Sequence, residues 1–449
     1  MNDTIVAIST SLGVGAISII RLSGKDSIEI VNSCFKGKDL RKVDTHTINY
    51  GYIIYNNEII DEVLVSVMRA PKTYTTEDIV EINCHGGITS TNKILEIMQL
   101  EGCRLAEPGE FTKRAFLNGR IDLLESESIM DMINSKSEEA RKLSMNGITG
   151  HISNKIESFR EELKKVLSQI EVNIDYPEYY DIEVITEEKI KNIIKKLKEK
   201  LIDLVKDSEN GITIKNGIKT VIVGRPNVGK SSILNKLLKE EKAIVTDIEG
   251  TTRDTVEGEI LLDGILLNII DTAGIRKTED KVEKIGVEKS LSKIEEADLV
   301  ILVINGSEEL TETDKKLLEE TKDKTRIIVI NKNDLKNKVN LNNNNNIVYT
   351  NTLTDEGVLT LVEKIKELFN LEQIKTKDYT YLSNTRQITL AKQALKNLLD
   401  AEKGIEENLP VDMVEIDLKN CFENLGEIIG KNYSNEIIDN LFKNFCVGK

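Results

Sequence analysis

The sequence predicts a multidomain protein of mixed α/β and α class. Its 449 residues are enough for two to four domains with substantial cores. Two parts of the chain have the apolar runs and alternation of β-strands, and two others have apolar residues at helical spacing. Their order predicts an α+β domain over 1–118, helical segments over 119–215 and 371–449, and an α/β domain over 216–370. Because helical segments flank the α/β domain, we expect one helical domain with the α/β domain inserted in it.

Composition and charge exclude several classes of protein. The net charge of −15 argues against DNA binding or RNA binding through the overall field, so contact with RNA needs a local patch or a partner. The five cysteines are odd in number and form no C-x-x-C pair, which argues against a disulfide framework or a zinc site. No apolar run approaches 18 residues and the first residues lack a signal-peptide pattern, so we expect a cytoplasmic protein without membrane contact.

The N-terminal segment has the pattern of several strands and a helix. Apolar runs and alternation predict strands over 4–8, 16–22, 63–68 and 79–82. Helical spacing follows over 88–100, and a Pro-Gly turn at 108–109 precedes more helical pattern. His85 stands before two glycines, between a strand and a helix. A lone histidine there is more often structural than catalytic, so it receives no chemical role.

The two helical segments show one apolar face per helix. Apolar residues recur at steps of three or four over 152–174, 190–205, 388–399 and 418–429. Pro177 interrupts the helical pattern after the first of these stretches. Lysines are frequent over 189–200, but glutamates are interspersed, so a solvated helix face is favoured over an RNA contact.

The α/β domain contains a phosphate-binding loop. The stretch G-R-P-N-V-G-K-S-S at 224–232 follows the apolar run 221–223 and precedes a helix pattern over 233–238. Its glycines let successive backbone N–H groups point at one anion, and the helix start adds positive charge. Lys230 is expected to reach the β- and γ-phosphates, and Ser231 to bind Mg²⁺.

Three further motifs indicate that the nucleotide is GTP. D-T-A-G at 271–274 follows an apolar strand and offers a carboxylate toward Mg²⁺ and a glycine N–H toward the γ-phosphate. T-T-R-D at 251–254 lies where a mobile loop with a threonine ligand for Mg²⁺ belongs. N-K-N-D at 331–334 follows another strand: Asp334 is expected to accept hydrogen bonds from guanine N1 and N2, and Lys332 to lie over the base.

Two details qualify this α/β domain. Asp263-Gly264 predicts a tight hairpin, which makes one strand antiparallel in a mixed, mostly parallel six-stranded sheet. Asn351-Thr352 stand where a GTPase usually has Ser-Ala-Lys, which weakens the assignment of that one base contact.

These residues together resemble the MnmE (TrmE) family of tRNA-modification GTPases. The resemblance covers nearly all of the chain and includes D-T-I-V-A at 3–7, the H-G-G and P-G-E-F stretches, the GTPase motifs and C-x-G-K at 446–449. It implies an N-terminal folate-binding and dimerisation domain, a helical domain and an inserted P-loop GTPase (G) domain. It also implies a homodimer that works with an FAD-containing MnmG-type protein in a heterotetramer or larger complex. Together they would add an aminomethyl-type (carboxymethylaminomethyl) group to C5 of the wobble uridine, position 34, of certain tRNAs.

The same resemblance implies which residues serve each ligand. Reduced folate, as 5-formyl- or 5,10-methylene-tetrahydrofolate, would contact Arg21, Glu81, Arg120 and Lys449. K⁺ would bind Asn227, Thr246, Ile248 and Thr251, and Mg²⁺ would bind Ser231 and Thr252. The catalytic residues would be Glu283, Lys230 and Thr252, and Cys446 is a candidate functional thiol. The expected GTP-binding residues are Asn227, Val228, Gly229, Lys230, Ser231, Ser232, Thr246, Asp247, Ile248, Glu249, Gly250, Thr251, Thr252, Asp271, Thr272, Ala273, Gly274, Asn331, Lys332 and Asp334.

Some alternatives stay open from the residues alone. Ile275 occupies the position of the water-orienting glutamine of many GTPases. The resemblance assigns that task to Glu283, although its spacing alone favours an exposed helix charge. Cys446 also fits a buried small hydrophobe. A GTP-dependent assembly or ribosome-binding switch would contain the same G domain, but the N-terminal matches and the C-x-G-K stretch favour tRNA modification.

Overall fold

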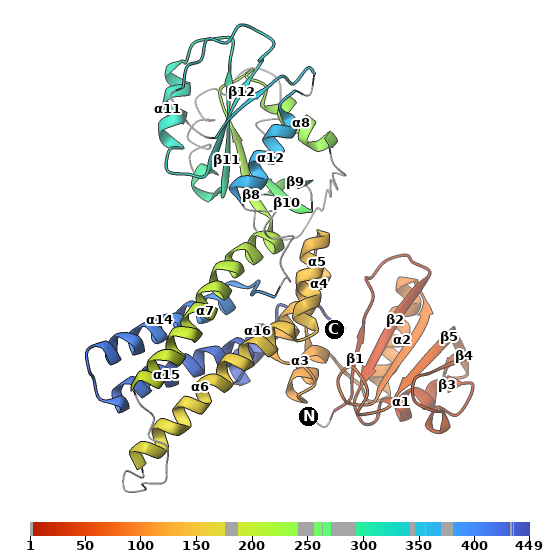
Figure 1. The fold of residues 1–449 in the computed structure, drawn as a ribbon. Helices are drawn as coiled ribbons and strands as arrows, with labels where there is room; N and C mark the ends of the chain where they lie inside the picture. Colours follow the sequence, from red (N-terminus) through yellow and green to blue (C-terminus); the bar gives the residue numbers. More distant parts are fainter. Residues whose placement is uncertain are drawn as a thin grey trace. The chain divides into compact units, whose positions relative to one another are not determined.

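The computed structural model describes residues 3–175, 187–240, 256–262, 264–270, 293–341, 346–354, 356–369, 380–431, 433 and 435–449. The chain forms two compact units. The first unit consists of Met1–Ile133, Gly147–Ile193 and Lys396–Lys449, and the second of Asn134–Asn146 and Ile194–Leu395. Figure 1 shows the helices and strands of both units.

A seven-stranded sheet forms the N-terminal part of the first unit (Figure 1). The strand order is β3-β4-β5-β6-β2-β1-β7. Neighbouring strands are antiparallel, except that β1 and β7 are parallel. The strands are β1 (Ile5–Ile8), β2 (Ile17–Ser23), β3 (Phe35–Lys36), β4 (Thr47–Tyr55), β5 (Glu58–Met68), β6 (Ile79–His85) and β7 (Arg104–Leu105).

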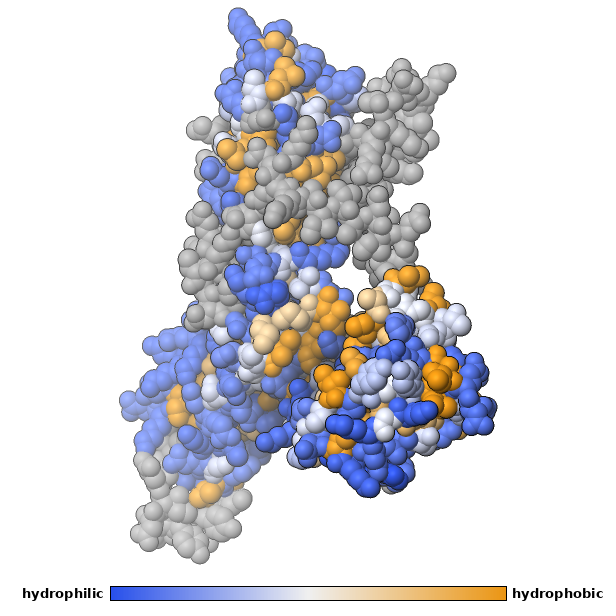
Figure 2. Space-filling model, turned by 90° about the vertical axis from the view of Figure 1, so that its right-hand side faces the viewer, coloured by the Kyte–Doolittle hydropathy of each residue, from blue (hydrophilic) through white to orange (hydrophobic). Residues whose placement is uncertain are grey.

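One face of this sheet packs on two helices; on the other face β1 packs on Phe111 of the following helix, and β4 and β5 carry exposed apolar side chains. Helices α1 (Ser27–Cys34) and α2 (Ile88–Leu100) share a core with Val63, Val65 and Val67 of β5. Side chains alternate along a strand, so Leu64 points to the opposite face, where Tyr50 of β4 is its partner in the register. Both side chains are exposed, and hydrophobic groups are visible on the surface of the N-terminal domain in Figure 2.

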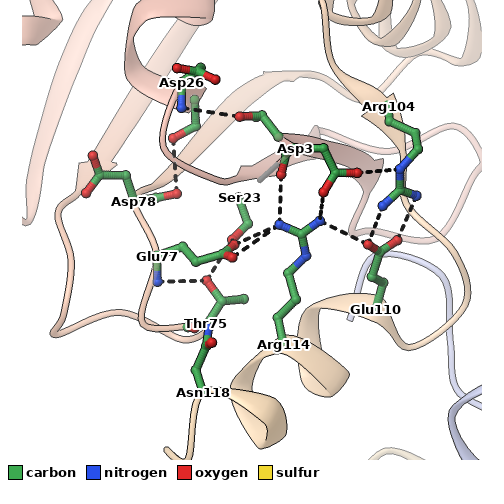
Figure 3. A network of polar contacts seen from close by, with 12 residues as sticks. Asp3, Ser23, Asp26, Thr75, Glu77, Asp78, Arg104, Glu110, Arg114 and Asn118 are labelled. Carbon is green, nitrogen blue, oxygen red and sulfur yellow. Dashed lines mark hydrogen bonds and ion pairs between the residues drawn. The ribbon is translucent and has the colours of Figure 1, made fainter. Parts of the chain in front are cut away.

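A buried arginine holds the next helix, α3 (Glu110–Leu117), against this sheet. Arg114 lies on α3 and its side chain is 1% exposed. Its guanidinium donates to Asp3, Glu77 and Glu110, while Arg104 contacts Asp3 and Glu110 from the other side (Figure 3). Since breaking a buried ion network leaves unpaired charges, these contacts fix α3 against the sheet.

Helices from distant parts of the chain pack together in the first unit. Helix α6 (His151–Asp175) lies against α15 (Val411–Ile428). Arg160 of α6 donates to the Phe422 carbonyl at 2.9 Å, and its guanidinium carbon lies 4.0 Å from the centroid of the Phe422 ring. Gly426 gives this arginine space, because a Cβ there would overlap Arg160 Nη1. This unit also contains α4 (Leu123–Asn134) and α16 (Asn435–Phe442).

The second unit contains a mixed, mostly parallel sheet of six strands, as predicted. Its order is β13-β12-β11-β8-β10-β9, and only β9 pairs antiparallel to its neighbour. Leu262 of β9 lies opposite Ile265 of β10 in an antiparallel pair, as the predicted hairpin requires. The strands are β8 (Ile218–Val223), β9 (Val256–Leu262), β10 (Ile265–Ile270), β11 (Leu299–Asn305), β12 (Arg326–Asn331) and β13 (Ile347–Thr350).

Helices that precede and follow this sheet in the sequence also contact one another. Ser208 of α7 (Glu187–Asn216) accepts a hydrogen bond from the Leu382 N–H at 2.9 Å. Glu209 of α7 pairs with Lys392 of α14 (Thr385–Glu406) at 2.8 Å. Further helices of the unit are α8 (Lys230–Glu240), α11 (Glu312–Glu320) and α12 (Val358–Leu368), and α5 (Glu138–Ile148) lies mostly within it. Among the described residues, no helix is long and apolar enough to cross a membrane.

Candidate functional site

The phosphate loop has the backbone geometry that an anion site needs. It joins the end of β8, at Val223, to the start of α8, at Lys230. Gly224, Asn227 and Gly229 have positive φ angles of 152°, 62° and 105°. A Cβ at Gly224 would clash with the Val303 carbonyl, so glycine is required for the close approach as well as for its conformation. The loop thus brings backbone N–H groups to the N-terminus of an eleven-residue helix.

Lys230 is half-buried within this loop. Its ammonium donates to the carbonyls of Gly224 at 2.8 Å and Arg225 at 2.9 Å. Partial burial lowers the pKa of Lys230, and a bound phosphate would oppose this shift by favouring the protonated amine. Ser231 and Ser232 follow in the first turn of α8, where a Mg²⁺ ligand is expected.

The base-recognition segment begins where β12 ends. Asn331 is buried and donates from Nδ2 to the Val228 carbonyl of the phosphate loop at 2.9 Å. Its Oδ1 accepts from the Thr350 hydroxyl at 3.2 Å. Lys332 has a positive φ of 65°, and Asp334 is exposed. The structure therefore places the N-K-N-D stretch beside the phosphate loop, with the carboxylate of Asp334 accessible to a ligand.

The atypical loop after β13 is ordered by its own asparagine. Asn351 Oδ1 accepts from the Leu353 N–H at 3.0 Å, and the Asn351 N–H donates to the Glu356 carbonyl at 2.9 Å. An asparagine that bonds the backbone two residues on forms an Asx turn. Asn351 thus closes this loop locally in place of the usual Ser-Ala-Lys.

Several predicted site residues lie outside the described part of the chain. They are Thr246, Asp247, Ile248, Glu249, Gly250, Thr251, Thr252, Asp271, Thr272, Ala273, Gly274 and Glu283. Their assigned roles stay predictions.

A second candidate site lies on the face of the N-terminal sheet that is opposite to α1 and α2, beside Tyr74 and Phe111. Arg21 of β2 and Glu81 of β6 are direct partners in the strand register, and Arg21 Nε lies 2.8 Å from Glu81 Oε1. The structure thus brings two of the predicted folate-site residues together, and their role stays a prediction. Its side chains are partly buried, so the ion pair is held in a fixed geometry beside solvent.

Two aromatic residues that the sequence analysis does not single out complete this site. The Arg21 guanidinium carbon lies 5.9 Å from the ring centroid of Tyr74 and 5.8 Å from that of Phe111. Arg120 lies 4.8 Å from the Tyr74 ring centroid and donates to the Tyr74 carbonyl at 3.0 Å. Tyr74 brings the two predicted arginines to one ring. Its sequence neighbourhood of threonines, lysine and acids carries no periodic signal.

The C-terminal residues reach the same site. The Gly448 carbonyl accepts from Arg21 Nη1 at 3.2 Å and from the Ser9 hydroxyl at 2.9 Å. Gly448 has φ of 86°, and a Cβ there would clash with the Ile8 carbonyl, which explains the glycine of C-x-G-K. Burial, with the charge of Arg21, lowers the pKa of Lys449. Cys446 is exposed, so its interpretation as a buried hydrophobe is wrong.

Comparisons with known proteins identify the family of the chain. The family model of the MnmE helical domain matches residues 123–446, and that of the GTP-binding protein TrmE N-terminus matches residues 4–120. The tRNA modification GTPase MnmE of Ligilactobacillus salivarius is 50% identical over 455 residues, covering 100% of this chain and 98% of that protein. The protein of the same name from Bacillus licheniformis is 50% identical over 458 residues and is covered completely. The chain belongs to the MnmE family.

Among solved structures, the chain is similar to the G domain of the T. maritima FeoB iron transporter. The sequence identity is 29%, over 34% of this chain and 98% of that domain, with a TM-score of 0.25. That score is too low to support a structural comparison by itself.

The two sites of this MnmE family member differ in what they are built to hold. The phosphate loop offers backbone N–H groups, one lysine and a helix start, which suit a polyphosphate. The N-terminal site offers two guanidinium groups, an ammonium, a carboxylate and two aromatic rings, which suit a flat ligand with acidic and hydrogen-bonding groups. Within the described ranges, no group of three or more histidine, cysteine and acidic side chains is arranged to hold a metal ion.

Proposed function

We propose that this chain is a K⁺-dependent GTP hydrolase that drives modification of the wobble uridine, position 34, of certain tRNAs. It would add an aminomethyl-type (carboxymethylaminomethyl) group to C5, with reduced folate as cofactor and an FAD-containing MnmG-type protein as partner. The observation that carries this proposal is the presence of a phosphate loop with its base-recognition segment and of a separate cationic, aromatic site at the N-terminal sheet.

Folate fits the chemistry of the N-terminal site. Arg21, Arg120 and Lys449 provide cations for an acidic glutamate tail, and Glu81 provides an acceptor for the N–H donors of a pterin. Tyr74 offers a ring surface beside both arginines. Bound reduced folate would supply the one-carbon unit. Cys446 lies near Lys449 and is a candidate for a thiol role in the same reaction.

The phosphate site would hold GTP with Mg²⁺ and K⁺. Asn227 is exposed in the loop, where its side-chain oxygen is accessible to a cation. We propose that Asn227 shares K⁺ with Thr246, Ile248 and Thr251, and that Ser231 and Thr252 hold Mg²⁺. Bound K⁺ would offset the charge that develops as the β–γ bond breaks. Glu283 would orient the attacking water.

A homodimer through the N-terminal domain fits the exposed apolar face of its sheet. Ile48, Tyr50 and Leu64 are exposed on neighbouring strands β4 and β5, although side chains of this type are usually buried.

The five cysteines are free thiols, as expected in a cytoplasmic protein.

Ligand titration of the full chain tests the folate assignment. Arg21→Ala and Glu81→Ala should each weaken binding of 5-formyl-tetrahydrofolate by tenfold or more in calorimetry, about 1.4 kcal/mol per charge-assisted contact, and leave GDP binding unaltered. Arg41→Ala is the control, because it removes an exposed positive charge from the same sheet domain. Unchanged folate affinity in both site variants would refute the assignment.

Hydrolysis assays test the GTP and K⁺ assignments. GTP turnover should be fast in K⁺ and slow in Na⁺, and Glu283→Ala should lower kcat by about 10²-fold or more with GTP affinity kept. Glu312→Ala is the control, since Glu312 is an exposed glutamate of the G domain. Asp334→Asn should weaken GTP relative to xanthosine triphosphate by about 1–3 kcal/mol. Equal rates in Na⁺ and K⁺ would exclude the cation role, and equal ATP and GTP binding would exclude guanine recognition.

A further inference from the structure

The second residue of the phosphate loop, Arg225, reaches the segment that follows β11. Val223 pairs with Leu302 of β11 in the sheet, so Gly224 lies beside the Val303 carbonyl and Arg225 follows toward the end of that strand. The Arg225 guanidinium forms an ion pair with Glu308, and its Nε lies 3.3 Å from Asp314 Oδ2. The loop that would hold the phosphates is thus tied to two carboxylates of another segment.

The carboxylate of Asp314 is buried at the first turn of α11. Its side chain is 1% exposed, and its Oδ2 accepts from the N–H and the hydroxyl of Thr311 at 3.0 and 2.7 Å. Its Oδ1 is buried and has no hydrogen-bond partner among the described residues. A buried carboxylate needs a counter-charge, and Arg225 supplies it. Arg225 is therefore held on this side by the charge balance of α11.

Glu308 extends the contact toward the base-recognition segment. Its Oε1 accepts from Asn305 Nδ2 at 2.7 Å. The neighbouring Gly306 N–H donates to the Asn331 carbonyl at 2.8 Å. Residues 305–308 therefore connect the phosphate loop with the strand end from which guanine would be read.

Positive charges from both the phosphate loop and the base-recognition segment act on Glu308. The hydrogen bond from Arg225 is the main reason that the pKa of Glu308 lies below its usual range, and the charges of Lys332 and Lys338 add to the effect. Lys332 is the residue expected over the base. Glu308 thus lies in the field of both the phosphate-loop arginine and the base-recognition lysine.

We infer that Arg225 and Glu308 are positioning residues that hold the phosphate loop and the base-recognition segment at a fixed separation. Asn331 already joins the two directly through the Val228 carbonyl, and Arg225–Glu308–Asn305 forms a second connection. Two connections define the distance between guanine and phosphate contacts, so a nucleotide engages both at once. This inference deepens the proposed GTP site and rests on it.

Binding kinetics of a fluorescent GDP analogue to the full chain test this inference. Glu308→Ala should raise the Kd by about three- to tenfold, mainly through faster dissociation, because a charge-assisted connection is lost on a half-exposed side chain. Glu308→Gln keeps an oxygen for Arg225, so its Kd should lie between that of the native chain and that of Glu308→Ala. Glu312→Ala removes the same charge four residues further on, from a side chain that is 91% exposed, and should bind like the native chain.

A double-variant cycle separates the connection from the net charge. Arg225→Met should raise the GDP Kd at least as much as Glu308→Ala and also lower the melting temperature, because Asp314 loses its counter-charge. In the double variant, the change in binding free energy should be smaller than the sum of the changes in the two single variants. Additive effects, or equal Kd values for Glu308→Ala and Glu312→Ala, would overturn the inference. If Arg225→Met does not fold, Glu308→Ala decides alone. Failure of the native chain to bind GDP would instead refute the proposed GTP site.

Discussion

Arg114→Met should destabilise the N-terminal sheet far more than Arg104→Met, although both arginines contact Asp3 and Glu110 (Figure 3). The Arg114 side chain is 1% exposed and that of Arg104 is 44% exposed. Removing a buried partner leaves charges unpaired where water does not reach them, which lowers the free energy of unfolding by about 3–5 kcal/mol. A solvent-screened arginine contributes about 0.5–1 kcal/mol. The greater burial of Arg114, together with its additional partner Glu77, should therefore make its loss the more destabilising one.

Hydrogen exchange with mass spectrometry measures this difference in the intact chain. Peptides from β1 and β6 should lose about 100-fold or more of their protection in Arg114→Met, and about fivefold or less in Arg104→Met, relative to the native chain. Peptides from β11 and β12 belong to the other compact unit and should keep their protection. Similar losses in the two variants, or an equal loss in β11 and β12, would contradict the reasoning.

Three further predictions concern pH and two glycines. The hydrogen bond from Arg104 is the main reason that the pKa of Asp3 is low, and the pKa of Glu110 is low because bonds from Arg104, the Glu107 N–H and Arg114 outweigh its burial. The stability that these carboxylates contribute is present above about pH 4.5 and is lost as the pH falls through their lowered pKa values. Urea midpoints should therefore fall as the pH is lowered below about 4.5, and less steeply in Arg114→Met. Gly229→Ala should abolish GDP binding in calorimetry, because its Cβ would overlap Asn331 Nδ2 at a φ of 105°; native affinity would contradict this. Gly426→Ala should lower the free energy of unfolding by about 1–3 kcal/mol in urea titrations, because its Cβ would overlap the buried Arg160, and Gly404→Ala on α14, where a Cβ meets ordinary contacts, is the control.

The sequence predicts those elements whose side chains have a regular period. Helix α2 has the predicted bounds, 88–100, since its apolar spacing and the preceding glycines mark it clearly. Strand β4, T-I-N-Y-G-Y-I-I-Y, is not predicted, because Asn49 and Gly51 interrupt its apolar alternation. In the structure Asn49 is buried and donates to the Val65 carbonyl, which a pattern of apolar residues does not reveal.

The candidate sites also contain parts that the sequence predicts and parts that it does not. Motif spacing finds the phosphate loop and the N-K-N-D segment, because each depends on backbone geometry encoded within a few residues. Tyr74 and the contact between Gly448 and Arg21 join parts of the chain more than 50 residues apart, so no local pattern predicts them. The connection through Arg225 and Glu308 likewise depends on two parallel strands ending at one edge of the sheet.

Analysis of tRNA from a deletion strain tests the central claim most directly. The strain would be complemented with the native chain, Lys230→Ala or Arg21→Ala, and its wobble uridines measured by mass spectrometry. The native chain should restore the aminomethyl-type group at C5, and neither variant should, because each lacks one of the two ligand sites. No restoration by the native chain, or full restoration by either variant, would contradict the account.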